Sequence, residues 1–169
     1  MAAATLLSER QWTERFSVKV NQQNVLLPFR LHFVGHDLPM DSCDQAWLFA
    51  RALQTRSNDG YERQRAARDL LAQFDAWCAP FIVALIGEYL VEIMDDVAAA
   101  LTPEVTAGLA EFIAQNGAYW ETTKRRVVSY WNVYYRRVCA SETRRVYAKP
   151  DYVGFRLVDY LERAANGDG

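Results

Sequence analysis

Apolar residues recur with two different periods along the chain, and the change of period separates a short strand segment from a long helical one. Between residues 14 and 33, apolar and polar positions alternate on both sides of the polar sequence NQQN at 21–24. Alternation around a short polar turn predicts a β-hairpin, which we place at 12–34. Pro28 has no amide hydrogen to donate, so its strand should lie at an edge or carry a bulge. The alternating apolar residues are Phe16, Val18, Val20, Val25, Leu27, Phe29, Leu31 and Phe33.

After Pro39 the apolar residues recur every three to four positions, which indicates helices. Capping residues, prolines and glycines divide this part of the chain into separate helices. The predicted helices cover about residues 41–55, 60–74, 80–100, 103–116, 118–140 and 150–165. Asp41 or Ser42 is expected to cap the first, and Thr102-Pro103-Glu104 begins the fourth. The predicted apolar faces are Ala46, Phe49, Ala50 and Leu53 in the first helix, and Val153, Leu157, Tyr160 and Leu161 in the last.

These patterns predict a mainly α fold, in which five to six helices and an N-terminal β-hairpin form one compact domain over residues 1–169. The helical body is expected to span 41–165, and the last residues, 166–169, should fray. The length of 169 residues suits one domain, and the hydrophobic content of 51% is enough for a sizeable core. We find neither a low-complexity linker nor a convincing internal repeat.

Composition bears on the compartment and on the class of partner. The most hydrophobic stretch, 76–87, is shorter than the roughly 20 residues that span a bilayer, so we expect no membrane association. Cys43, Cys78 and Cys139 form no CxxC pair and no disulfide framework, which favours a cytoplasmic protein. The net charge of −2 gives no overall attraction to nucleic acid, so such binding would need a local basic patch.

Charge is strongly segregated along the chain. Residues 69–123 contain nine acidic side chains and no Lys or Arg, whereas residues 124–149 contain eight basic side chains and one acid, Glu142. Blocks of this kind carry information about surface potential and partners, although not about the fold.

The acidic block supplies a candidate binding stripe on the predicted 80–100 helix. At helical spacing Glu88, Glu92, Asp95 and Asp96 share a narrow sector, and apolar residues fill most of the remaining circumference. Such a stripe faces water or pairs with basic groups. A hard cation could also bind carboxylates one turn apart, but no histidine or second acidic segment completes a cage, so we expect no metal.

The basic block supplies a second candidate surface, on the predicted 118–140 helix. The sequence KRRVVSYWNVYYRRV at 124–138 places aromatic and branched residues around Trp120 and Trp131 on one face, which a soluble helix would bury. Bases stack on rings that stand exposed beside cations, so burial of this face would weaken a nucleic-acid interpretation. The opposite face and its flanks carry the candidate binding residues Arg125, Arg126, Ser129, Asn132, Arg136 and Arg137, followed by Arg144 and Arg145.

Recognisable catalytic motifs are missing from the sequence. It contains no nucleophile elbow, phosphate-binding loop, dinucleotide glycine motif or zinc-protease motif. His32 and His36, with Asp37 and Cys43 nearby, match no compact zinc spacing. Cys139 lies among arginines, which would lower the pKa of an exposed thiol, but no histidine lies near it in sequence. We therefore predict no catalytic residues and no cofactor, although carboxylate acid–base chemistry leaves no sequence motif.

We interpret the chain as a non-enzymatic, protein-binding module, such as an adaptor, an inhibitor or an immunity-type protein. It would dock on another protein through its segregated acidic and basic faces, and pairing of those faces between copies would give a homo-oligomer. The alternative hypothesis is a nucleic-acid-binding protein that uses the basic face of the 118–140 helix and residues 144–149. Internal pairing of the two charge blocks would remove the main support for both interpretations.

Overall fold

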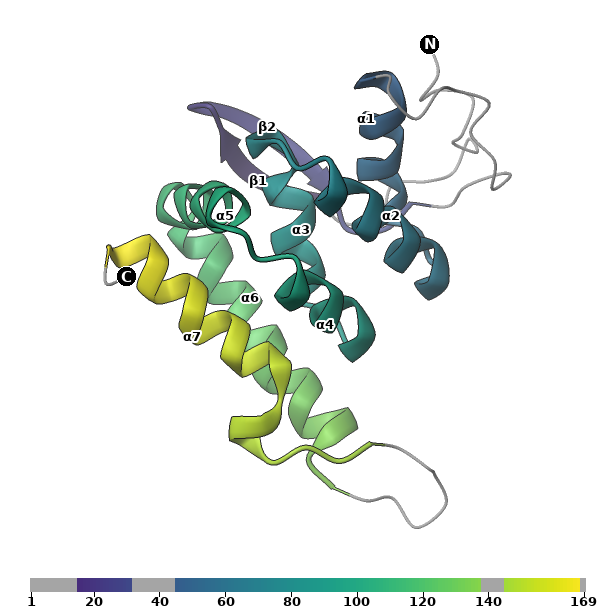
Figure 1. Cartoon of the computed structure of the whole chain (residues 1–169), viewed down its shortest axis with the longest axis vertical. Helices are drawn as coiled ribbons and strands as arrows, with labels where there is room; N and C mark the ends of the chain where they lie inside the picture. Colours follow the sequence, from purple (N-terminus) through teal and green to yellow (C-terminus); the bar gives the residue numbers. More distant parts are fainter. Residues whose placement is uncertain (1–14, 32–44, 138–144, 168–169) are drawn as a thin grey trace.

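A two-stranded antiparallel hairpin precedes a body of helices in the computed structural model, which describes residues 15–31, 45–137 and 145–167 (Figure 1). The mainly α class with an N-terminal hairpin is thereby confirmed. The strands and α-helices are β1 (Arg15–Val20), β2 (Gln23–Pro28), α1 (Gln45–Gln54), α2 (Gly60–Ala72), α3 (Ala79–Ile86), α4 (Val91–Ala99), α5 (Pro103–Gln115), α6 (Gly117–Tyr130) and α7 (Val153–Asn166). Shorter helical turns are η2 (Ala76–Cys78), the π-helical η3 (Trp131–Tyr135) and η4 (Lys149–Asp151).

The hairpin forms within the predicted range 12–34, with a tighter turn than the four polar residues suggest. Strand β2 ends at Pro28, so Phe29 and Leu31 follow it instead of extending it, and Phe33 lies outside the described residues. Asn21 and Gln22 alone connect the strands, and both have positive φ angles, of 49° and 64°. Positive φ at both central residues is what a two-residue turn needs to match the twist of its strands. Val18 and Leu27, which face the helices, are buried. Pro28 ends β2 in a sheet of two edge strands, so it removes no central hydrogen bond.

Helix α3 is the centre of the hydrophobic core. Its sequence, APFIVALI, is apolar on every side, and each of its eight residues is buried. It contacts α4, α5 and α6, and it lies between the hairpin end of the molecule and α4 (Figure 1). A helix without a polar face must be covered on several sides, and these neighbours provide the cover.

The predicted continuous helix at 80–100 is wrong, because the chain breaks between α3 and α4. Gly87 ends α3, and Leu90 precedes α4 in an extended conformation with φ −85° and ψ 103°. The hydroxyl of Tyr135 donates to the Tyr89 carbonyl and accepts from Val91 N, 3.4 Å away, so it replaces two backbone partners that the break removes. The break adds one helix to the predicted number and removes Glu88 from the expected stripe.

The helix boundaries otherwise follow the local signals, with two apolar faces that differ from prediction. Asp59 caps α2 by accepting from Tyr61 N, and Thr102 caps α5 by accepting from Val105 N. In α1 the buried residues are Trp47, Leu48, Ala50, Ala52 and Gln54, whereas the predicted face members Ala46 and Phe49 are exposed. In α7 Val153, Leu157 and Leu161 are buried as predicted, but Tyr160 is exposed. The expected caps Asp41 and Ser42 lie outside the described residues.

Helices α6 and α7 run side by side along the lower part of the molecule, and α5 packs against α7 (Figure 1). The predicted 118–140 helix is α6 followed by the π-helical turn η3, as far as the described residues extend. Within those residues, no single helix is both long and apolar enough to cross a membrane. The pair α4 and α5 meets the length and composition criteria together, but it is bent by 119°.

Candidate functional site

Glu88 lies at the break between α3 and α4, where three arginines from other parts of the chain surround its carboxylate. Arg30 Nη1 lies 2.8 Å from Glu88 Oε1, and Arg63 Nε lies 2.9 Å from Glu88 Oε2. Arg56 also donates to Glu88 Oε1. The side chains of Arg56, Arg63 and Glu88 are all at least nine-tenths buried. This cluster joins the segment after β2, the loop before α2, helix α2 and the α3–α4 break.

Burial determines the electrostatics of this cluster. Desolvation lowers the pKa of Arg56, while attraction to Glu88 opposes that effect. Arg56 Nε also donates to the Thr55 carbonyl at 2.9 Å, and Arg63 Nη1 donates to the Ser57 carbonyl at 2.8 Å. Buried charges need such partners, because an unpaired ion in the interior is costly. The cluster is closed to solvent, so we interpret it as a structural clamp.

The remaining carboxylates of the predicted acidic stripe lie on α4 and differ from one another in their surroundings. Asp96 forms a two-point pair with Arg68, at 2.9 and 3.1 Å, and accepts from Gln64 Nε2 at 2.7 Å. Glu92 and Asp95 are exposed. Partial burial raises the pKa of Asp95, while attraction to Arg156 opposes that shift. The four acids therefore do not form one continuous docking stripe.

Helix α6 and η3 carry an exposed surface that we call the α6 strip. Its residues are Arg125, Val128, Ser129, Asn132, Val133 and Arg136, and all of them are exposed. Arg125 Nη2 donates to Thr122 Oγ1 at 3.0 Å, and Arg136 Nη1 donates to Asn132 Oδ1 at 3.1 Å. Within the described part of the chain, neither arginine has a carboxylate within ion-pairing distance. The α6 strip therefore keeps its positive charge.

Two valines give the α6 strip an apolar component. Val133 is 66% exposed, and Val128 is 43% exposed although helical spacing predicts it on the buried face with Trp120 and Trp131. Trp120, Thr123 and Val127 form the buried face instead. Val128 stands at the edge of the predicted apolar face, and the buried face of α6 is narrower than predicted.

Several other predicted basic residues lie in different environments. Arg126 is half-buried and stacks over the rings of Phe16 and Phe29, at 4.7 and 5.0 Å, which ties α6 to the hairpin. Lys124 pairs with Glu121 and with Glu162 of α7, at 2.6 Å in both cases. Arg137 and Arg145 are exposed, and Arg144 lies outside the described residues.

The aromatic residues of this region pack mainly on one another. Tyr89 at the helix break contacts Tyr130 and Tyr134, with ring centroids 6.0 and 5.6 Å apart. Trp131 packs edge-on against Phe155 of α7, and its indole nitrogen donates to the Tyr147 carbonyl at 3.0 Å. Rings held in this way are not free to receive stacked bases, which is what single-strand binding requires.

The described residues offer little support for a catalytic or metal centre. They contain no group of three or more His, Cys, Asp or Glu side chains able to hold a metal ion. Cys78 is fully buried, and burial raises the pKa of its thiol to about 11. His32, His36, Asp37, Cys43 and Cys139 lie outside the described residues.

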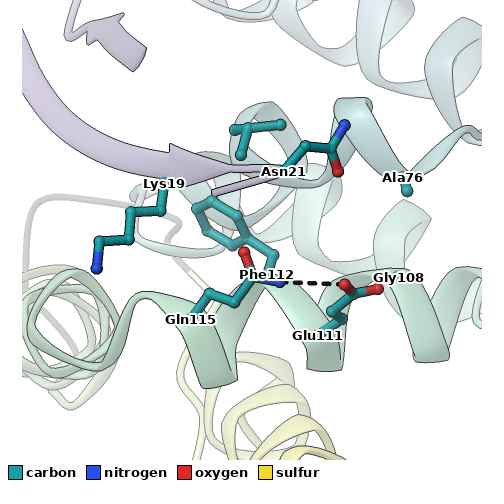
Figure 2. A pocket seen from close by; sticks show the side chains of 8 residues that line it. Lys19, Asn21, Ala76, Gly108, Glu111, Phe112 and Gln115 are labelled. Atoms are coloured by element: carbon teal, nitrogen blue, oxygen red, sulfur yellow. Dashed lines mark hydrogen bonds between the residues drawn. The ribbon is translucent and has the colours of Figure 1, made fainter. Parts of the chain in front are cut away.

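Hollows in the surface of the described residues differ greatly in size. The first, between the hairpin and α5, has a volume of about 20 Å³, roughly the space of a water molecule. Figure 2 shows Lys19 and Asn21 above α5, where Gln115 donates to Glu111 at 3.0 Å. The second is a groove of about 430 Å³ between the start of α2 and the start of α4. Of these two, the second is large enough to hold a side chain or a small ligand.

Comparison with protein-family models, with curated proteins and with solved structures gives no significant match for this chain.

Proposed function

We propose that this chain is a protein-binding module that docks on an acidic partner protein through the α6 strip. The observation that supports the proposal is a pair of exposed arginines, Arg125 and Arg136, which have no ion-pair partner among the described residues and share a surface with exposed valines. Arginine with apolar contact area is typical of protein interfaces, and the charge would guide an acidic partner during encounter. The sequence alone led us to expect docking through an acidic and a basic face, whereas the proposed interface uses the basic surface only.

The composition of the strip favours a protein over a nucleic acid. A nucleic-acid groove presents exposed ring faces beside its cations. Here Tyr89, Tyr130 and Tyr134 contact one another, and the Trp131 ring, 5.7 Å from the Arg136 guanidinium, packs on Phe155. Val133 is the most exposed apolar side chain of the strip. A phosphate backbone gains nothing from exposed valine methyl groups, while a protein partner can bury them.

Site-specific photocrosslinking tests this proposal directly. A photoreactive amino acid at Val133, in the full chain expressed in its native cells, should give a covalent adduct with a distinct acidic protein, identified by mass spectrometry. The same amino acid at Glu104, exposed at the start of α5, is the positional control and should not give that adduct.

Charge-reversal variants then establish whether the basic charge matters. Arg125→Glu combined with Arg136→Glu should abolish the adduct. Arg156→Glu combined with Arg163→Glu makes the same change in charge on exposed positions of α7 and should preserve it. The proposal fails if both double variants behave alike, if the adduct contains only a second copy of this chain, or if Val133 yields no protein adduct. Retention on DNA or RNA that only the first pair abolishes would favour the nucleic-acid alternative.

A further inference from the structure

The groove between α2 and α4 has the chemistry of a site for a cationic side chain. It lies where the first turn of α2 faces the break before α4, and its volume is about 430 Å³. Its lining residues are Asp59, Gly60, Tyr61, Gln64, Tyr89, Leu90, Glu92 and Ile93. Two carboxylates and two phenol rings are among them, and there is no lysine or arginine.

The carboxylates make the groove negative, to different degrees. Asp59 Oδ1 accepts from Tyr61 N at 2.8 Å, so the positive end of α2 offsets part of its charge. Glu92 is exposed on the opposite wall. Arg145 is close enough for Glu92 to contribute to a raised Arg145 pKa, after the larger effect of its hydrogen bond to Tyr147. No ion pair within 4 Å joins Arg145 to Glu92 in the described residues, so the Glu92 carboxylate keeps room for a ligand cation.

Tyr61 supplies a surface that attracts cations. It is 81% exposed, which is unusual for so large a ring, whereas Tyr89 on the other wall is 38% exposed and already has the Arg63 guanidinium 6.0 Å from its ring centre. A cation over an exposed aromatic face is attracted by the negative face of the ring, and more strongly when it is desolvated. Leu90, half-buried between them, offers an apolar surface for an alkyl stem. A lysine side chain combines these features, since it has four methylene groups and a terminal ammonium.

We propose that this groove binds a lysine side chain presented by a partner protein. The ammonium would lie between the Glu92 carboxylate and the ring of Tyr61, and the methylene groups would cover Leu90 and the exposed part of Tyr89. This inference stands apart from the α6 strip, because the groove and the strip share no residue and would recognise opposite charges.

A titration with a small probe tests the site without a partner. The full chain, labelled with ¹⁵N, is titrated with Nα-acetyl-lysine methylamide and followed by two-dimensional NMR. Saturable shifts should be confined to the amides lining the groove. The norleucine analogue, which keeps the alkyl stem and lacks the ammonium, should give no comparable shifts. Equal shifts with both probes, or none with either, would overturn the proposal.

Single substitutions test separately the attraction of the ammonium to the Tyr61 ring and to the Glu92 carboxylate. Tyr61→Ala and Glu92→Gln should each weaken lysine binding by about fivefold, which corresponds to the gain expected from one exposed contact of this kind. Both side chains are exposed, so neither change removes a core contact. The matched controls Tyr160→Ala and Glu104→Gln alter exposed residues away from the groove and should leave the affinity unchanged. Loss of affinity in the controls as large as in the groove variants would also overturn the proposal.

Discussion

Three guanidinium groups share the Glu88 carboxylate, and two of them, on Arg56 and Arg63, are almost fully buried. Glu88→Gln keeps the size of the side chain but leaves these cations without their counter-charge. Removing one member of a buried ion pair typically costs about 3–5 kcal/mol. We therefore expect a large decrease in the free energy of unfolding, measured by urea denaturation followed by tryptophan fluorescence.

The Arg68–Asp96 pair provides the control for the Glu88 prediction. Asp96→Asn removes one negative charge from the same region, but Arg68 has a side chain that is 58% exposed and can be solvated instead. The decrease in the free energy of unfolding should therefore be much smaller for Asp96→Asn than for Glu88→Gln. Equal losses in the two variants would show that burial of the Glu88 cluster does not determine its contribution.

The sequence contains no signal for the partners of Glu88. Arg30, Arg56 and Arg63 come from segments far from Glu88 in the chain. Arginine is rarely buried, so the sequence alone predicts that each of them is exposed. The interpretation of Glu88 as one of four stripe residues followed from assuming a continuous helix. The basic residues Arg125 and Arg136 were easier to predict, because their exposure depends only on local helical spacing.

At the scale of elements, Gly154 determines how closely α7 approaches its neighbours. A Cβ atom at this position would lie 2.6 Å from Tyr152 Cε1, 2.9 Å from Val127 Cγ1 and 3.2 Å from Met94 Sδ. Gly154→Ala should therefore force α7 away from α6 and α4. We expect a loss of about 1–3 kcal/mol in the free energy of unfolding, which exceeds the gain in helix propensity.

Gly117→Ala is the matched control for Gly154→Ala. A Cβ atom on Gly117, the first residue of α6, would meet nothing within 4 Å. This substitution should leave the urea midpoint unchanged or raise it slightly, since alanine reduces the conformational entropy of the unfolded chain. A Gly154→Ala variant as stable as the Gly117→Ala variant would contradict the tight approach of α7.

Local signals explain why most elements could be predicted and the α3–α4 break could not. The hairpin is predicted by alternation, and the helices α2 and α5 by caps and a proline, all of which act within a few residues. Gly87 is the only local signal at the break, and an isolated glycine is common inside a helix. The hydroxyl of Tyr135, distant in sequence, completes the hydrogen bonds there.

At the scale of the whole molecule, charge segregation along the chain differs from charge segregation in space. Glu88 and Asp96 pair with arginines that precede the acidic block, and Glu162 pairs with Lys124. Folding thus neutralises part of both blocks. Among the surfaces that stay charged in the described residues are the α6 strip and the α2–α4 groove, which have opposite signs. Both proposals depend on that residual pattern and not on the block charges themselves.

The buried weak acids predict how the stability of the whole molecule depends on pH. Burial raises the pKa of Cys78 from 9.0 to about 11, and burial also raises the pKa values of Tyr119 and Tyr152. A raised pKa in the folded state means that folding favours the neutral form of the group. The resulting contribution to the free energy of unfolding is complete below the pKa that the group has in the unfolded chain. It is lost as the pH rises, because the group ionises first in the unfolded chain. The urea midpoint should therefore fall from about pH 9 to about pH 11. A Cys78→Ala variant should start less stable and lose less over that interval; an equally steep loss would mean that the thiol does not contribute.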